Sequence, residues 1–230
     1  MYSGGRAPES DKWSSILDNQ EKQYLEPTLL VDSDHPSIKA KAAELTKGMT
    51  DNVEKAKALF YFVRNEIKYN IYVDKYEADF FKASSTLARK EGYCVQKAVL
   101  LAALARASGI PARLGFAKLI NHAMPDKLRN WLTSNILPFH GFNELYLNGK
   151  WVKATATFDL KTCERGKIIP TEFDGVHDSM FHPRDLDGNL HMEYLEFYGS
   201  FPDLPLERLW KTATAHFGEH FIRPSLKPQA

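Results

Sequence analysis

The 230-residue sequence contains little cysteine and no long apolar run. Two cysteines, Cys94 and Cys163, are too few for a disulfide framework, so we expect a reducing compartment. The most apolar run, from 98 to 107, is far shorter than the roughly 20 residues that a membrane span needs. The first residues lack the apolar core of a signal peptide, and we therefore expect a cytoplasmic protein that does not bind membranes.

An excess of charge of either sign is also missing. Lys and Arg total 30 and Asp and Glu total 29, which gives a formal net charge of +1. Such a balance does not favour nucleic acid as a partner. The sequence has no CxxC or HExxH motif, and its histidines and aspartates between 177 and 191 lack the spacing of metal ligands. We therefore predict no metal and no cofactor, whereas the oligomeric state stays open.

The composition that remains is that of a globular protein, with 43% hydrophobic residues. Residues 1–30 are polar and predict an N-terminal tail or a loosely docked segment. Residues 31–169 hold the clear hydrophobic periodicities and form the predicted core. Residues 170–230 show no clean period and predict a loop-rich C-terminal extension that packs on this core.

Two helices stand out within the predicted core. Asp51, with Glu54 three residues later, forms a capping box before a helical pattern that continues to Ile67. The segment 94–108 is apolar almost all round, which predicts a buried central helix that ends before Gly109. Between them, residues 74–89 are mixed and predicted to be irregular.

Three strands are expected after the central helix, at 113–120, 139–147 and 150–158, with an irregular connection at 121–138. Asn148 and Gly149 between the last two are the strongest short-range signal of a hairpin. A two-residue turn there pairs Leu147 with Lys150, and all paired residue numbers then sum to 297. In this register the side chains of His140 and Thr155 lie on one face of the hairpin. If that face packs on the central helix, His140 can meet Cys94 at the start of the helix.

A cysteine at a helix N-terminus has its thiolate stabilised by the helix dipole and by free backbone N–H groups. A thiolate nucleophile also needs a base within hydrogen-bond reach, which is most often histidine. Cys94 is therefore the predicted nucleophile and His140 the predicted base.

The run from Gly92 to Arg113, with its cysteine, long apolar helix and Gly-Ile-Pro-Ala-Arg end, closely resembles the cysteine block of the transglutaminase-like superfamily. The run from His140 to Val152 is similar to the histidine block, and the resemblance covers roughly residues 50–160. It implies an α+β, papain-like fold with the cysteine helix packed on an antiparallel sheet. It also implies acyl transfer at a carboxamide or peptide bond of a protein or peptide substrate, through a Cys94 thioester. The compact size favours hydrolysis by a protease or amidase over cross-linking.

One departure concerns the third catalytic residue, because the family usually has Asp where this chain has Thr155. Three possibilities remain open: Thr155 orients His140, Asp159 does so, or no residue does and the site is weakened. Papain-like proteases use a neutral Asn at this place, so a neutral partner is compatible with catalysis. The aromatic residues beside these positions are the candidates for substrate binding: Tyr69, Tyr93 and Phe142.

Two other functions are compatible with the same residues. A weakened site would leave a peptide-binding module with the fold but without activity. A redox-sensing thiol at Cys94 would need Cys163 as its resolving partner.

Overall fold

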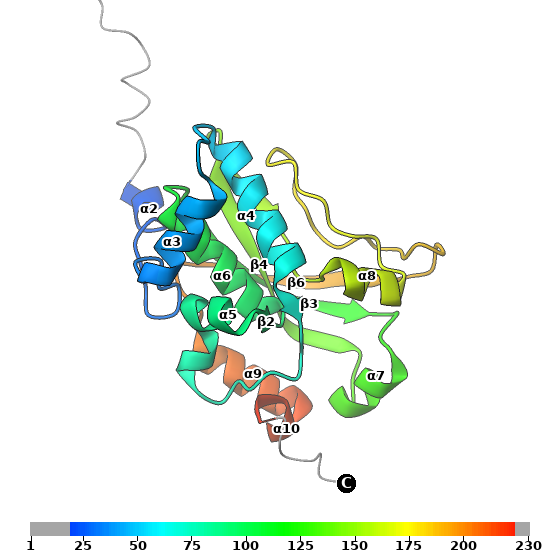
Figure 1. The fold of residues 1–230 in the computed structure, drawn as a ribbon. Coiled ribbons are helices and arrows are strands. Elements are labelled where there is room, and N and C mark those ends of the chain that lie inside the picture. Colours follow the sequence, from blue (N-terminus) through cyan, green and yellow to red (C-terminus); the bar gives the residue numbers. More distant parts are fainter. Residues whose placement is uncertain (1–18, 224–230) are drawn as a thin grey trace, which may run out of the picture.

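A computed structural model describes residues 19–223, so that most of the predicted N-terminal tail lies outside the described residues. The chain has an α+β fold built on a four-stranded sheet in the order β5-β4-β3-β6 (Figure 1). All three strand pairs in this sheet are antiparallel. The strands of the sheet are β3 (Ala112–Asn121), β4 (Ile136–Leu147), β5 (Lys150–Ala154) and β6 (Met192–Phe201).

Helices and two short strands surround this sheet. A two-stranded parallel pair joins β1 (Lys68–Tyr69) to β2 (Glu91–Gly92). The helices are α2 (Asn19–Lys22), α3 (Pro36–Leu45), α4 (Asn52–Glu66), η1 (Ala78–Phe81), α5 (Ala83–Arg89), α6 (Cys94–Ala107), α7 (Asp126–Leu132), α8 (Leu160–Gly166), α9 (Leu206–Phe217) and α10 (Glu219–Ile222). No helix in the described part of the chain is long and apolar enough to cross a membrane.

The two helices with the clearest sequence signals form as predicted. The Asp51 side chain caps α4 by accepting a hydrogen bond from the Glu54 N–H at 2.9 Å. Helix α6 is buried on all sides, with α3, α4 and α5 packed around it and β3 and β4 beneath it (Figure 1). Gly109 follows α6 with φ +79°, a left-handed conformation that glycine adopts without strain.

The hairpin has the predicted register, with Leu147 opposite Lys150. The turn residues Asn148 and Gly149 both have positive φ, as a tight two-residue hairpin turn requires. Strand β5 nevertheless ends at Ala154, so the predicted strand 150–158 is too long. The cause is a change of partner, because the Thr155 N–H donates to the Ser179 carbonyl at 2.9 Å instead of continuing the ladder with β4.

The face of β4 that packs on α6 is the opposite of the predicted one. Asn143 donates from Nδ2 to the Ala98 carbonyl of α6 at 2.8 Å. A Cβ on Gly141 would lie 3.0 Å from the Cα of Val95, so any larger residue would push strand and helix apart by a few tenths of an ångström. His140, on the other face, therefore points away from the body of α6.

Several elements carried no clear signal in the sequence. Helices η1 and α5 replace the irregular segment expected at 74–89, and α7 occupies part of the connection between β3 and β4. The C-terminal segment does more than pack on the core, because β6 pairs with β3 as an edge strand of the main sheet. Its exposed face carries the apolar side chains Leu195 and Phe197, 45% and 53% exposed, so the sequence of the strand lacks the polar–apolar alternation typical of a half-buried strand.

Candidate active site

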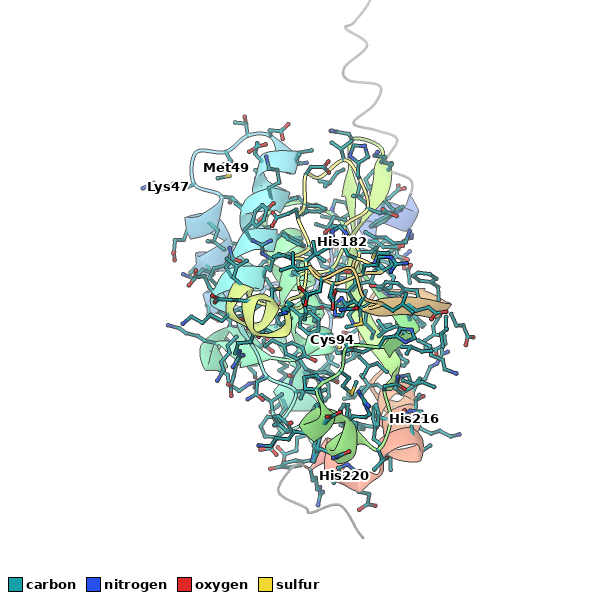
Figure 2. The ribbon with its side chains drawn as sticks, turned by 90° about the vertical axis from the view of Figure 1, so that its right-hand side faces the viewer. Lys47, Met49, Cys94, His182, His216 and His220 are labelled. Atoms are coloured by element: carbon teal, nitrogen blue, oxygen red, sulfur yellow. The ribbon has the colours of Figure 1, made fainter. Side chains whose placement is uncertain are left out.

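Cys94 is the first residue of α6 and lies two residues after the end of β2, a strand of the small parallel pair. Tyr69 of β1 is opposite Gly92 of β2, two residues before the cysteine. The cysteine side is the face of the molecule seen in Figure 2, where Cys94 lies near the middle. The residue is only 8% exposed.

Burial decides the protonation state of this thiol. It raises the pKa of Cys94 to about 11. Hydrogen bonding from the backbone of Gly141 and Val95, and the positive charge of Lys75, act in the opposite direction and are outweighed. The stabilisation expected at the helix start is therefore present, but it does not produce a thiolate in this arrangement.

His140 lies next to Gly141 on β4 and is 1% exposed. Its ring packs against Phe181, with centroids 5.0 Å apart, and against Tyr194 at 6.2 Å. Its Nε2 atom has no hydrogen-bond partner among the described residues. Burial lowers the pKa of the imidazole to about 3, so that it is neutral at pH 7.

The structure thus brings the predicted nucleophile and the predicted base to one place, since the backbone of Gly141 reaches Cys94. Transfer of a proton from a group of pKa about 11 to one of pKa about 3 costs about 11 kcal/mol before the attraction of the ions is counted. The described arrangement is therefore a closed form, in which both groups are neutral.

Neither of the two residues considered as the orienting partner forms a described hydrogen bond with His140. The Thr155 hydroxyl lies 3.4 Å from the sulfur of Met180 and also interacts with the Tyr194 hydroxyl. Asp159 caps α8, where its carboxylate accepts from the Thr162 N–H at 2.9 Å.

A second oxygen of Asp159 accepts from the Tyr69 N–H at 2.7 Å. Although burial opposes ionisation, these backbone hydrogen bonds hold the pKa of Asp159 below its usual value. Asp159 therefore connects α8 to β1, and through β1 to the segment before Cys94.

The three predicted substrate-binding aromatics fall in different places. Tyr69 is half-buried and contacts Phe158 edge-on, with ring centroids 4.8 Å apart. Tyr93 is buried at the start of α6, and its hydroxyl has no partner among the described residues. Phe142 lies on the sheet face away from α6, where it contacts Phe197 at 6.0 Å.

A buried lysine beside the site had no signal in the sequence. Lys75 is 0% exposed, and its ammonium donates to the carbonyls of Ile71 and Val73 at 2.6 Å each. It also donates to the Phe221 carbonyl at 3.2 Å and lies 5.1 Å from the centroid of the Tyr93 ring. Burial lowers the pKa of Lys75 to about 7, and the charges of Asp74 and Cys94 oppose this change.

The segment between β5 and β6 covers His140, which the sequence did not indicate because the segment has no regular period. Phe181 is 7% exposed and stacks on Phe158 at 5.0 Å in addition to its contact with His140. Asp178 attaches the segment to the sheet through an ion pair of 2.9 Å with Lys153. In Figure 2 the label of His182, from this segment, lies directly above Cys94.

Two titratable groups of the segment between β5 and β6 have local partners, whereas both ring nitrogens of His191 are buried without one in the described part of the chain. His177 contacts the Asp174 carboxylate at 2.7 Å, and Asp187 forms an ion pair with Lys167 at 2.6 Å. Within residues 19–223, no group of three or more His, Cys, Asp or Glu side chains is arranged to hold a metal ion. Cys163 is a free, buried thiol and belongs to a separate hydrophobic cluster from Cys94.

A buried helix-start cysteine and a strand histidine on an antiparallel sheet define the papain-like class of fold. The family model for the transglutaminase-like superfamily matches residues 39–156, just over half of the chain. The protein therefore belongs to the transglutaminase-like superfamily, as the cysteine and histidine blocks predicted. No curated protein matches the sequence significantly.

One solved structure shows the same fold. The chain is similar to a candidate cysteine protease from Cytophaga hutchinsonii, with a TM-score of 0.51 and 19% identity over 82% of this chain. It spans 56% of that protein's length. It is also similar to the periplasmic domain of TgpA from Pseudomonas aeruginosa, with a TM-score of 0.45 and 20% identity, covering 62% of this chain and 48% of that one.

Proposed function

We propose that the protein is a thiol enzyme that transfers an acyl group from a carboxamide or peptide bond, with water as the favoured acceptor. The observation that carries the proposal is the position of Cys94 at the start of α6, where the Gly141 backbone of the histidine strand reaches it. Family membership and the likeness to a candidate cysteine protease support the same reaction class.

In the proposed reaction, His140 takes the proton of the Cys94 thiol, and the sulfur attacks the carbonyl carbon of the substrate. Backbone N–H groups at the start of α6 are suited to stabilise the negative oxygen that forms. The C–N bond then breaks, and the imidazolium gives its proton to the departing amine. Water activated by His140 attacks the thioester, which releases the acid and restores the thiol.

The closed arrangement must open for this chemistry. Cys94 and His140 are 8% and 1% exposed, so a substrate carbonyl has no direct access to the sulfur. Movement of the segment that carries Phe181 would admit both solvent and substrate and would relieve the burial that keeps both groups neutral. Long irregular segments of this kind often control access to a site.

The test is the rate of Cys94 alkylation by iodoacetamide against pH, read by peptide mass spectrometry in the wild type and in His140→Ala. Cys163 is the internal reference, because it is also buried and has no histidine assigned to it. An inflection below the ordinary thiol pKa of about 8.5 that disappears without His140 supports a thiolate–imidazolium pair. Equal and slow reaction of Cys94 in both proteins, and also after Phe181→Ala opens the site, contradicts it.

Hydrolysis is measured separately with a mixture of short peptides, by mass spectrometry of the products. Cys94→Ala is the matched control. New peptide termini that need Cys94 support a protease, whereas amine incorporation without cleavage supports cross-linking.

A second candidate is a peptide-binding module without activity. It is favoured by the Nε2 atom of His140, which is buried without a hydrogen-bond partner, so no acid or hydroxyl orients the ring through that atom in the described arrangement. This candidate predicts that peptides bind equally to the wild type and to Cys94→Ala and are recovered unchanged.

A further inference from the structure

A cavity of about 220 Å³ lies beside the candidate site, between α7, α8 and the ends of β3 and β4. Its apolar walls come from four parts of the chain: Ile71, Met124, Leu128, Leu137, Phe158 and Ile168. This volume is below the range of about 300–1,000 Å³ typical of pockets for whole small ligands. It suits one large side chain.

The cavity shares two walls with the candidate site. Tyr69 lines it and belongs to the strand paired with the residues just before Cys94. Phe158 lines it and stacks on Phe181, whose ring in turn packs at a tilt against His140. A chain with its carbonyl at Cys94 would therefore have this cavity within reach of a neighbouring side chain.

The polar residues around the cavity already have partners. Asn121 accepts at its Oδ1 from the Ala123 N–H at 3.1 Å, and the Thr162 hydroxyl donates to Asp159 at 3.0 Å. The Arg165 guanidinium donates to the Lys161 carbonyl at 3.2 Å. The lining of the cavity is mainly hydrocarbon and favours an apolar occupant. Arg165 is the charged residue in this lining and forms no ion pair among the described residues, so the apolar preference is set against an acidic occupant.

We infer that this cavity is a specificity pocket that binds a large apolar side chain of the peptide substrate, such as phenylalanine or leucine. This inference rests on the proposed function, because the pocket can select a substrate only if Cys94 reacts with a carbonyl next to it. It adds a substrate class, namely peptides with a bulky apolar residue near the bond that reacts.

The first experiment measures binding without any reaction. Acetylated, amidated tripeptides Gly-Xaa-Gly, with Xaa as Phe, Leu, Glu or Gly, are titrated into Cys94→Ala, and the methyl NMR signals of Met124, Leu128 and Ile168 are followed. We expect the Phe and Leu peptides to shift these signals and to bind at least about tenfold more tightly than the Glu and Gly peptides. Equal binding of all four peptides, or shifts elsewhere only, overturns the inference.

The second experiment fills the pocket. Ala123 lines the cavity and is exposed, so that Ala123→Phe can enter the mouth without displacing the core. Asn130→Phe adds the same side chain at an exposed position on α7 that does not line the cavity. We expect the preference for the Phe peptide to fall to about one in Ala123→Phe and to persist in Asn130→Phe. An unchanged preference in Ala123→Phe contradicts the pocket.

Reactive peptides separate this inference from the proposed function. Peptidyl chloromethyl ketones with Phe or Gly side chains are compared with iodoacetamide as alkylating agents of Cys94. A reactive thiol without a Phe preference refutes the pocket and leaves the enzyme. A Phe preference in the NMR titration with an inert thiol refutes the enzyme and leaves the pocket in a binding protein.

Discussion

Phe181→Ala should activate Cys94, because the ring of Phe181 packs directly against the predicted base. Its ring centroid lies 5.0 Å from that of His140, and the side chain is 7% exposed. Removal of the ring admits water to the imidazole and lowers the cost of its protonation. His140 can then accept the thiol proton, which it cannot do in the closed form.

The size of the effect follows from the two pKa values. A thiol with a pKa of about 11 is ionised to about 10⁻⁴ at pH 7, whereas one with the ordinary value of about 8.5 is ionised to about 3%. Relief of burial alone would therefore raise the alkylation rate at pH 7 by about 300-fold, and pairing with His140 would raise it further. Because Phe181 is one wall of several, we expect at least about a tenfold increase.

The assay is alkylation by iodoacetamide from pH 5 to 10, with the extent of reaction at Cys94 and Cys163 read from the same digests. Leu186→Ala is the matched control, since Leu186 is on the same segment and 63% exposed. Phe→Ala changes in cores cost about 3–5 kcal/mol, so the thermal midpoint of each variant is measured as well. The reasoning is refuted if Cys94 in a folded Phe181→Ala keeps the wild-type rate, or if the rate rises equally when His140 is also replaced.

Three other perturbations test the electrostatics and the helix cap. Lys75→Met removes the buried amine; because the pKa of Lys75 is about 7, its positive charge is present mainly below pH 7, and there Cys94 alkylation should slow several-fold, with the half-buried Lys82→Met as a control; an unchanged rate below pH 7 assigns Lys75 a purely structural role. Asp159→Asn should lower the unfolding free energy by about 1 kcal/mol at pH 7. Because the pKa of Asp159 is lowered in the folded state, this difference should vanish as the pH falls through that pKa. Urea titrations of both proteins at pH 7 and below pH 4 measure it. Burial lowers the pKa of His140 to about 3 in the folded state, below the unfolded value near 6.5, so the unfolded state binds a proton more readily as the pH falls. The wild type should therefore lose about 2 kcal/mol of unfolding free energy between pH 7 and 5. His140→Gln should lose less; an equal loss in both proteins would show that other groups are responsible.

Local sequence signals are sufficient to predict several features of the fold. The all-apolar run 94–107, with Gly109 behind it, predicts a buried helix with Cys94 at its start, and the structure has that helix. The Asn148–Gly149 turn predicts the pairing of β4 with β5, because few backbones other than a two-residue hairpin use positive φ at both positions. Capping of α4 by Asp51 is equally local, since donor and acceptor are three residues apart.

Long-range contacts decided the features that the sequence did not predict. Which face of β4 packs on α6 depends on the close approach of Gly141 to Val95, and both faces of this strand carry apolar residues. Asp159 lies at a sequence position from which it could orient His140, but its carboxylate accepts a hydrogen bond from the backbone N–H of Tyr69, 90 residues earlier. Lys75 is buried by carbonyls from its own loop and from Phe221, which no local pattern reveals.

Residue identity and spacing therefore determine the family, the position of Cys94 at a helix start and the hairpin of this protein, because each depends on interactions within a few residues or on one repeating hydrophobic period. The protonation of Cys94 and His140 is decided only by the tertiary structure. Burial raises the pKa of Cys94 more than the helix start lowers it, and burial also lowers the pKa of His140. The side chains and backbone that bury both groups, such as Phe181 against His140, lie far away in the sequence.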